Sequence, residues 1–135
     1  MGYTIEEIEG IGPAYGAKLA SAGVKSTDDL LRLCANRKGR AAVAESTGIS
    51  EKLLLGWANK ADLMRISGIG PQFSDLLEAA GVDTVKELAT RRADNLTVKL
   101  GEINAAKKLA RTVPVESVVS DWIDKAKGLD PTISH

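Results

Sequence analysis

Two glycine corners carry the residue types and the spacing with which this chain could bind a ligand. The sequence GIGP stands at residues 10–13 and again at residues 68–71, and each copy runs directly into a predicted helix. Glycine adopts positive φ and lets the backbone approach a ligand closely, and a helix N-terminus presents N–H groups that have no partner within the helix. Together with the helix dipole, these groups attract an anion such as a phosphate. The corners therefore predict backbone contacts to phosphate from Gly10, Ile11 and Gly12 and from Gly68, Ile69 and Gly70.

Charges beside the corners distinguish the two copies. Glu6, Glu7 and Glu9 flank the first corner, where they repel an anion, whereas Arg65 and Ser67 precede the second corner. A charge at a helix terminus contributes only about 0.3–1 kcal/mol when it is exposed, so useful affinity needs several corners or neighbouring basic side chains. We therefore expect phosphate to contact the second corner more readily than the first.

The net charge of the chain is zero, with 18 Lys and Arg against 18 Asp and Glu, which is unusual for a dedicated nucleic-acid binder. The charge nevertheless alternates: residues 1–30 and 61–90 each carry a net charge of −3, whereas residues 31–60 carry +4 and residues 91–120 carry +3. The basic stretches are either solvated helix faces or the source of charge for binding nucleic acid. Their candidate residues are Arg37, Lys38, Arg40, Lys99, Lys107, Lys108 and Arg111. Of the last three, Lys107 and Arg111 are expected to share an exposed helix face with Lys108 adjacent, because their spacing is i, i+1 and i+4.

Side chains for enzyme or metal chemistry are sparse. His135 is the single histidine and has no partner for metal or base chemistry, while Asp28 and Asp29 fit the acidic first turn of a helix better than an acid–base pair. Cys34 is the only cysteine, so it forms no internal disulfide, and its apolar neighbours indicate a small core residue. The sequence predicts no catalytic residue, no metal site and no small-molecule substrate.

The composition is that of a soluble globular protein, because 44% of the residues are hydrophobic and 27% are charged. A single cysteine favours a reducing compartment, and the sequence shows neither a leader nor an apolar run near the roughly 18 residues of a membrane span. We therefore expect a cytoplasmic protein that makes no membrane contact.

The elements that must position the corners are helices, since aromatic residues make up only 4% of a chain rich in Ala and Leu. Apolar residues at helical spacing predict a long helix from Glu51 to about Ile66. Trp57 and Trp122 lie on apolar stripes, which favours core packing over stacking on bases. The pattern predicts an all-α fold of about ten short helices. Expected helix caps are Thr4, Ser26 or Thr27, Ser50, Thr84 and Asn104.

The predicted helices divide into two halves, residues 1–62 and residues 63–113, that share the long helix. A proline at position 114 breaks the chain before a C-terminal helix at residues 114–128. We expect residues 129–135 to form a flexible tail.

Both corners fit a longer pattern, in which apolar residues precede the glycines and a small residue follows four positions after the second glycine. The pattern is filled by Ile5, Ile8, Gly10, Ile11, Gly12, Gly16 and Leu19 and again by Leu63, Ile66, Gly68, Ile69, Gly70, Ser74 and Leu77. It resembles the helix-hairpin-helix motif. Weaker copies at residues 48–50 and 103–104 make a series of four, with a serine or an asparagine in place of the second glycine.

Each half, a full corner followed by a weaker one, is similar to the N-terminal domain of archaeal strand-exchange recombinases. The whole chain resembles an uncharacterised bacterial family, a domain of unknown function, through the stretches TGISEKLLLGWANKADLMRISGIG and LLEAAGVDTVKEL. The resemblance to helix-hairpin-helix proteins implies a non-enzymatic module that contacts the DNA backbone without reading its sequence, with a monovalent cation as a possible bridge between corner carbonyls and phosphate. The alternatives are a protein-interaction or self-assembly module with complementary acidic and basic faces, and a repair-type lyase that would use Lys18 or Lys60.

Overall fold

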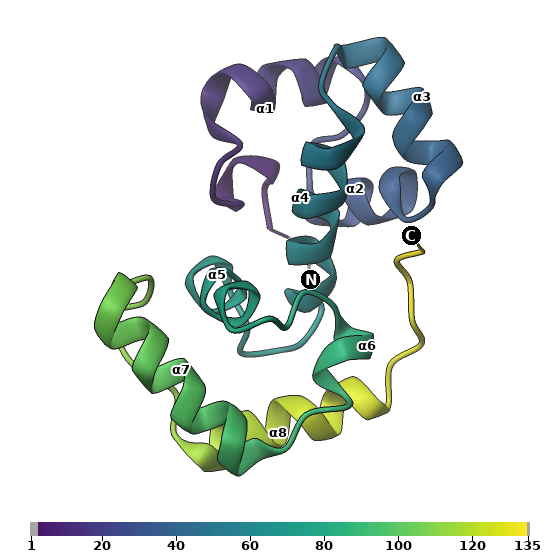
Figure 1. The fold of residues 1–135 in the computed structure, drawn as a ribbon. Coiled ribbons are helices and arrows are strands. Elements are labelled where there is room, and N and C mark those ends of the chain that lie inside the picture. Colours follow the sequence, from purple (N-terminus) through teal and green to yellow (C-terminus); the bar gives the residue numbers. More distant parts are fainter. Residues whose placement is uncertain (1–2, 135) are drawn as a thin grey trace. The chain divides into compact units, whose positions relative to one another are not determined.

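The computed structural model describes residues 3–134, and this part of the chain is built from helices (Figure 1). An isolated bridge between Thr4 and Ser26 is the only pairing of extended backbone among the described residues. The predicted all-α fold is therefore confirmed, with eight α-helices and one short 3₁₀ helix in the described chain. In chain order they are η1 (Ile5–Glu7), α1 (Gly12–Ser21), α2 (Thr27–Cys34), α3 (Arg37–Thr47), α4 (Glu51–Leu63), α5 (Pro71–Ala79), α6 (Val85–Leu88), α7 (Ala93–Lys107) and α8 (Glu116–Lys127).

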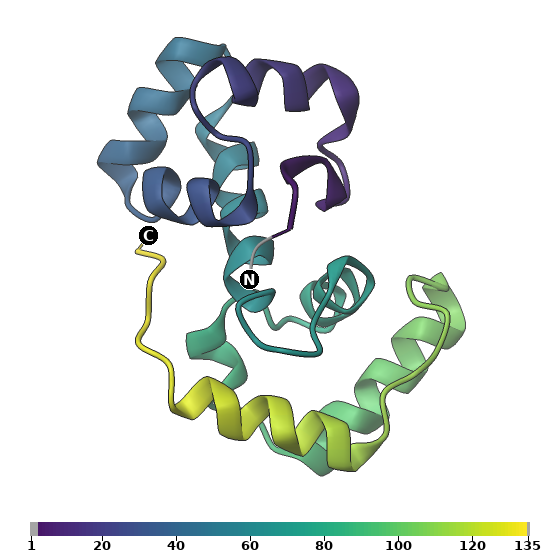
Figure 2. The same cartoon turned by 180° about the vertical axis from the view of Figure 1, so that it is seen from behind.

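Two compact units make up the described chain, and Figure 2 shows their helices from behind. The first unit contains residues 3–65, with η1 to α4, together with residues 132–134 from the other end of the chain. The second unit is Ile66–Pro131 and contains α5 to α8. The structure thus divides the chain after Arg65, not after residue 62, and includes α8 in the second unit. Because α4 ends at Leu63, this helix lies within the first unit and is not shared.

Polar caps start several helices, as the sequence predicts. The side-chain oxygens of Ser26, Ser50 and Thr84 each accept a hydrogen bond from the N–H three residues ahead, at 3.1–3.2 Å. By contrast, α1 and α5 begin at the glycine corners without a side-chain cap. The backbone of each corner therefore forms the N-terminus of the helix that follows it.

The predicted cap at Asn104 is wrong, because this residue lies inside α7. Its side-chain amide is buried and closes the loop after the helix: Nδ2 donates to Ala110 O at 3.0 Å, and Oδ1 accepts from Ala110 N at 2.9 Å. The helix continues to Lys107, and its C-cap Lys108 has a left-handed φ of 53°. Asparagine satisfies main-chain groups in loops as well as at helix starts, and here the loop contact prevails.

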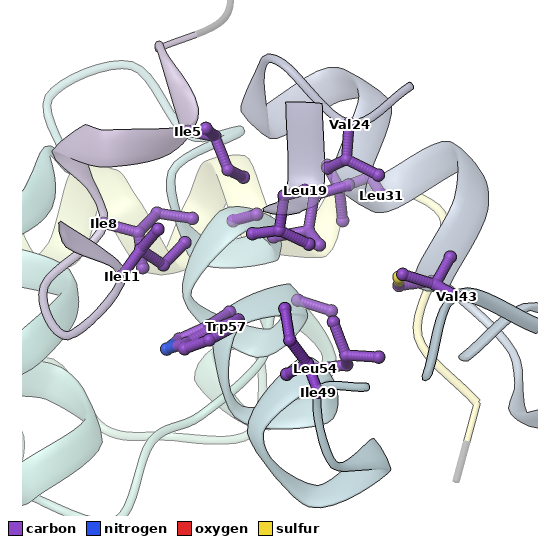
Figure 3. Close-up of a cluster of buried hydrophobic side chains, with 14 of the residues drawn as sticks. Ile5, Ile8, Ile11, Leu19, Val24, Leu31, Val43, Ile49, Leu54 and Trp57 are labelled. Atoms are coloured by element: carbon purple, nitrogen blue, oxygen red, sulfur yellow. The ribbon is translucent and has the colours of Figure 1, made fainter. Parts of the chain in front are cut away.

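The core of the first unit collects apolar side chains from η1, the first corner and all four of its helices (Figure 3). Ile8 and Ile11 from the corner, Leu19 from α1 and Trp57 from α4 belong to one buried cluster. Trp57 is 4% exposed, which confirms its predicted place in the core. The corner is thus held to the core by buried apolar side chains that come before, between and after its glycines.

The last helices of the two units share a sequence pattern. Residues 47–61 read TGISEKLLLGWANKA and residues 112–126 read TVPVESVVSDWIDKA, with Thr, Glu, Trp, Lys and Ala at the same positions. Helices α4 and α8 therefore correspond, and each begins at the shared glutamate. It follows that residues 113–115 are the counterpart of residues 48–50, and that the weaker copy expected at residues 103–104 is misplaced.

Candidate functional site

The first glycine of each corner adopts a backbone conformation that other residues rarely take. The φ angles are 94° at Gly10 and 99° at Gly68. A Cβ atom at Gly10 would lie 3.6 Å from Trp57 Nε1, and one at Gly68 would lie 3.1 Å from Trp122 Nε1. Glycine is therefore favoured at both positions for two reasons: φ is positive, and the nearby indole ring limits the space for a side chain.

An aromatic pair fixes the tryptophan under each corner. The ring centroids of Tyr15 and Trp57 are 5.2 Å apart with an interplanar angle of 61°, and those of Phe73 and Trp122 are 5.2 Å apart at 55°. The first pair is edge-to-face and the second is tilted, and such contacts favour a defined ring orientation. Each corner is thus held between the helix that follows it and the last helix of its own unit.

A lysine three residues after each tryptophan reaches the carbonyl that precedes the corner. Lys60 Nζ lies 3.4 Å from Glu9 O, and Lys125 Nζ lies 3.5 Å from Ser67 O. These contacts are long, so each adds little as a hydrogen bond. Each places an ammonium group near its corner, and the ammonium of Lys125 also forms an ion pair with Asp121 at 2.9 Å. Lys125 is absent from the residues that the sequence nominates, and the repeated WANKA and WIDKA stretches are the signal that identifies it.

Within each Gly-Ile-Gly triplet the isoleucine is structural. The side chains of Ile11 and Ile69 are buried, and their N–H groups donate to Ile8 O at 3.2 Å and to Ile66 O at 3.0 Å. This corrects the prediction that their N–H groups point to a ligand. The backbone groups that remain for an anion are those of the glycines and of the first turn of α1 or α5.

The second glycines differ between the corners. Gly12 has a φ of 63° and is the first residue of α1, whereas Gly70 has a φ of −101° and a ψ of −167° and precedes α5 as its N-cap. Ser74 N donates to Gly70 O at 2.9 Å, which closes the first turn of α5. The two corners therefore present their first-turn N–H groups in different geometries.

Two of the basic residues nominated from the sequence serve internal roles. Arg40 is 3% exposed, and its guanidinium donates to main-chain carbonyls, so it does not extend the surface cluster of Arg37 and Lys38. Arg65 lies in the first unit and forms an ion pair at 2.8 Å with Asp62, whose carboxylate is 1% exposed. A buried carboxylate needs a partner, and Arg65 supplies one to Asp62. That Arg65 favours an anion at the second corner stays a prediction.

The main chain of the basic segment at the end of α7 contacts the first turn of α5. The N–H of Arg111 donates to Gln72 Oε1 at 3.2 Å, and Gln72 is the second residue of α5. Lys107, Lys108 and Arg111 are all exposed, but they do not share a helix face as predicted, because α7 ends at Lys107 and the chain turns at Lys108. We refer to residues 107–111 as the basic turn.

Lys99 belongs to a separate basic group at the start of α7. Together with five other residues it lines a hollow of about 200 Å³. One of these residues, Arg91, forms an ion pair with Glu87 at 2.8 Å. Arg92 hydrogen-bonds to Asp94 and holds the pKa of that carboxyl below its ordinary value of 3.8. The lining residues are Thr90, Arg91, Arg92, Asn95, Leu96 and Lys99.

Groups suited to covalent or metal chemistry are scarce in the described chain. Residues 3–134 contain no cluster of three or more His, Cys, Asp and Glu side chains arranged to hold a metal ion. Burial raises the pKa of the Cys34 thiol to about 11, so the thiol stays protonated and is a poor nucleophile near neutral pH. Among the described residues, no helix is both long enough and apolar enough to cross a membrane.

Comparison with other proteins gives one match. No curated protein and no solved structure matches the chain. The family described as "Domain of unknown function (DUF4332)" matches residues 9–129, which include both corners, the basic turn and every α-helix. The chain therefore belongs to this uncharacterised domain family.

Proposed function

We propose that the protein binds the backbone of nucleic acid, DNA in the first instance, without reading its sequence, and that the second unit makes the main contact. In this proposal the second corner acts as a helix-hairpin-helix corner: the backbone N–H groups at the start of α5 receive a phosphate oxygen. The basic turn and Lys125 supply the positive charge beside them. The first corner, with Glu6, Glu7 and Glu9 around it, contributes less.

The observation that carries the proposal is the hydrogen bond between Arg111 N and Gln72 Oε1. Neither corner has a Lys or Arg directly after its proline, where Ala14 and Gln72 stand. In the second unit the bond to Gln72 holds the basic turn next to this position. A basic segment distant in sequence is thus held next to the start of α5, whereas the alanine at the equivalent position of the first unit has no side-chain group that could make such a bond.

Sequence-independent binding follows from the type of contact. Backbone N–H groups and lysine ammonium groups recognise phosphate charge, which every nucleotide carries, whereas reading bases requires side chains aimed at the grooves. The affinity of such contacts falls steeply with salt, because each phosphate that is neutralised releases condensed counterions.

The test replaces Lys107, Lys108 and Arg111 together with glutamate and measures the affinity for duplex and single-stranded DNA and for RNA over a salt series. A backbone binder loses up to three phosphate contacts, so the magnitude of its salt slope on duplex DNA falls by up to about 2.7, at about 0.9 per contact. A control with equal change in net charge replaces the exposed Lys25, Lys52 and Lys86 with glutamate and keeps the wild-type slope. Equal slopes for the two triple variants, or no binding by the wild type, would reject the proposal.

A protein-interaction or self-assembly module is the second candidate, and exposed valines beside the basic turn favour it. Val113 and Val115 are 42% and 62% exposed. An apolar patch next to a basic turn suits an acidic partner surface, such as the surface around Glu6 and Glu9 of another copy. In this case the basic-turn variant loses self-association in a sizing experiment, and Glu6→Lys with Glu9→Lys restores it.

Glu7 is left unchanged in that rescue because its carboxylate has a structural role. It accepts a hydrogen bond from Thr4 N at 2.7 Å at the start of η1. Rescue of size without rescue of nucleic-acid binding distinguishes this second candidate from the first.

A further inference from the structure

The end of the described chain returns to the first unit. Residues 132–134, predicted as part of a flexible tail, lie beside the junction between α2 and α3 (Figures 1 and 2). Ser134 N donates to Ala35 O at 2.8 Å, and the side chain of Ile133 packs against the core of the first unit. These contacts explain the difference from the prediction, because an apolar anchor and main-chain bonds hold the segment.

Arg40 forms the floor of this contact. Its Nη1 donates to Cys34 O and to Ala35 O, both at 3.0 Å, and its Nη2 donates to Ser134 O at 2.6 Å. Two of the acceptors thus come from the α2–α3 junction and one comes from the returning segment. Among the described residues, none of the side-chain ion pairs includes Arg40.

A permanently charged side chain such as that of Arg40 is unusual at a position that always stays buried. Arginine keeps its proton in proteins, and burying its charge without a carboxylate partner is unfavourable compared with an apolar side chain. The charge is well suited, however, to a position that is covered at some times and open to water at others. When the segment leaves, the guanidinium keeps its two junction carbonyls and water replaces the carbonyl of Ser134.

We propose that the α2–α3 junction is a docking socket for an extended peptide segment, with Arg40 as its floor, and that residues 132–134 are a releasable clasp that fills it in cis. The attachment is small: Ile133 is half-buried, and Thr132 and Ser134 are exposed. The segment also follows directly on the second unit, which ends at Pro131. The closed clasp therefore adds the residues that follow Pro131 to the first unit, and its release would free them from that unit.

The first experiment follows amide exchange at Ser134 in the full chain. Ile133→Lys removes the apolar anchor and adds a charge that Arg40 repels, so exchange at Ser134 should be at least tenfold faster than in the wild type. Thr132→Lys adds the same charge at an exposed position and should keep the protection. Equal exchange in the wild type and in Ile133→Lys would show that no clasp forms. Protection that rises with protein concentration would show that the segment of a second copy fills the socket, which overturns the assignment in cis.

The second experiment asks whether the opened socket accepts a peptide in trans. A labelled peptide with the sequence of residues 128–135, GLDPTISH, is titrated with the wild type and with Ile133→Lys. The variant should bind it at least tenfold more tightly, because the clasp occupies the wild-type socket, and Arg40→Met in the same background should weaken this binding. If the opened variant binds the peptide no better than the wild type does, residues 132–134 are packed chain and the docking socket is refuted.

Discussion

Alanine at Gly68 should destabilise the protein more than alanine at Gly10, although the two glycines have the same place in the two units. Both have positive φ, 99° and 94°, so both substitutions force an L-residue into a strained conformation. This shared backbone cost is about 1–3 kcal/mol. The difference between them comes from the space that the new methyl group would fill.

The new methyl group meets an indole at different distances in the two units. At Gly10 the Cβ would lie 3.6 Å from Trp57 Nε1, an ordinary van der Waals contact, so only the backbone cost applies. At Gly68 the distance to Trp122 Nε1 would be 3.1 Å, and the indole must move by a few tenths of an ångström. Trp122 is 1% exposed and packs on Phe73, so this shift adds an overpacking cost of about 1–3 kcal/mol. The expected totals are about 1–3 kcal/mol for Gly10→Ala and about 2–6 kcal/mol for Gly68→Ala.

Urea unfolding followed by circular dichroism gives the two losses, and amide exchange assigns each loss to its unit. A double-mutant cycle with Trp122→Phe isolates the steric contribution, because phenylalanine has no indole N–H to meet the methyl group. Gly68→Ala should then cost less than it does beside tryptophan. Equal losses at the two glycines, together with no coupling to Trp122, would refute the argument from close approach. Losses below about 1 kcal/mol at both would refute the requirement for positive φ.

Three further outcomes are expected. Gly12→Val should lower stability more than Gly70→Val, because φ is 63° at Gly12 and −101° at Gly70. Gly70→Val should instead weaken nucleic-acid binding more than Gly12→Val does. Melting and binding assays on both variants separate the two effects. The Arg92 hydrogen bond depresses the pKa of Asp94, so its contribution to stability is present above the ordinary value of 3.8 and is lost as the pH falls through the lower folded value; Asp94→Asn should therefore flatten the dependence of melting temperature on pH in this acid range. Cys34, with its pKa raised to about 11 by burial, should react with a disulfide reagent far more slowly in the native protein than in urea at pH 8, and equal rates would contradict its burial.

Features governed by neighbouring residues could be read from the sequence. The caps at Ser26, Ser50 and Thr84 depend on a residue and the N–H three positions ahead, and all three are found as predicted. The burial of Trp57 and Trp122 follows from apolar residues at helical spacing. The all-α fold is the sum of such local preferences.

Features that depend on distant segments could not be read in the same way. Arg40 stands in a run of basic residues that indicates a surface, but its guanidinium is covered by a segment that lies 94 residues further along the chain. The hydrogen bond between Gln72 and Arg111 likewise joins residues 39 positions apart. Asparagine favours both helix caps and loop contacts, so the sequence alone does not distinguish a helix start at Asn104 from its bond to the loop at Ala110. The fold decides between the two. The sequence shows the repeat of the two corners. The correspondence of α4 with α8 becomes visible only when residues 47–61 are compared with residues 112–126.

The indole ring next to each corner allows binding at that corner to be followed by tryptophan fluorescence. The chain has two tryptophans, and each unit contains one of them, directly under the first glycine of its corner. Replacing either indole with phenylalanine leaves a protein whose remaining tryptophan fluorescence comes from a single corner. An anion that settles on that corner changes the field at the ring and shifts its emission, while a ligand bound elsewhere leaves it unchanged. Each candidate site thus has an intrinsic fluorophore. Titrating an anion into the two single-tryptophan variants separately would show which corner binds it, without an added label.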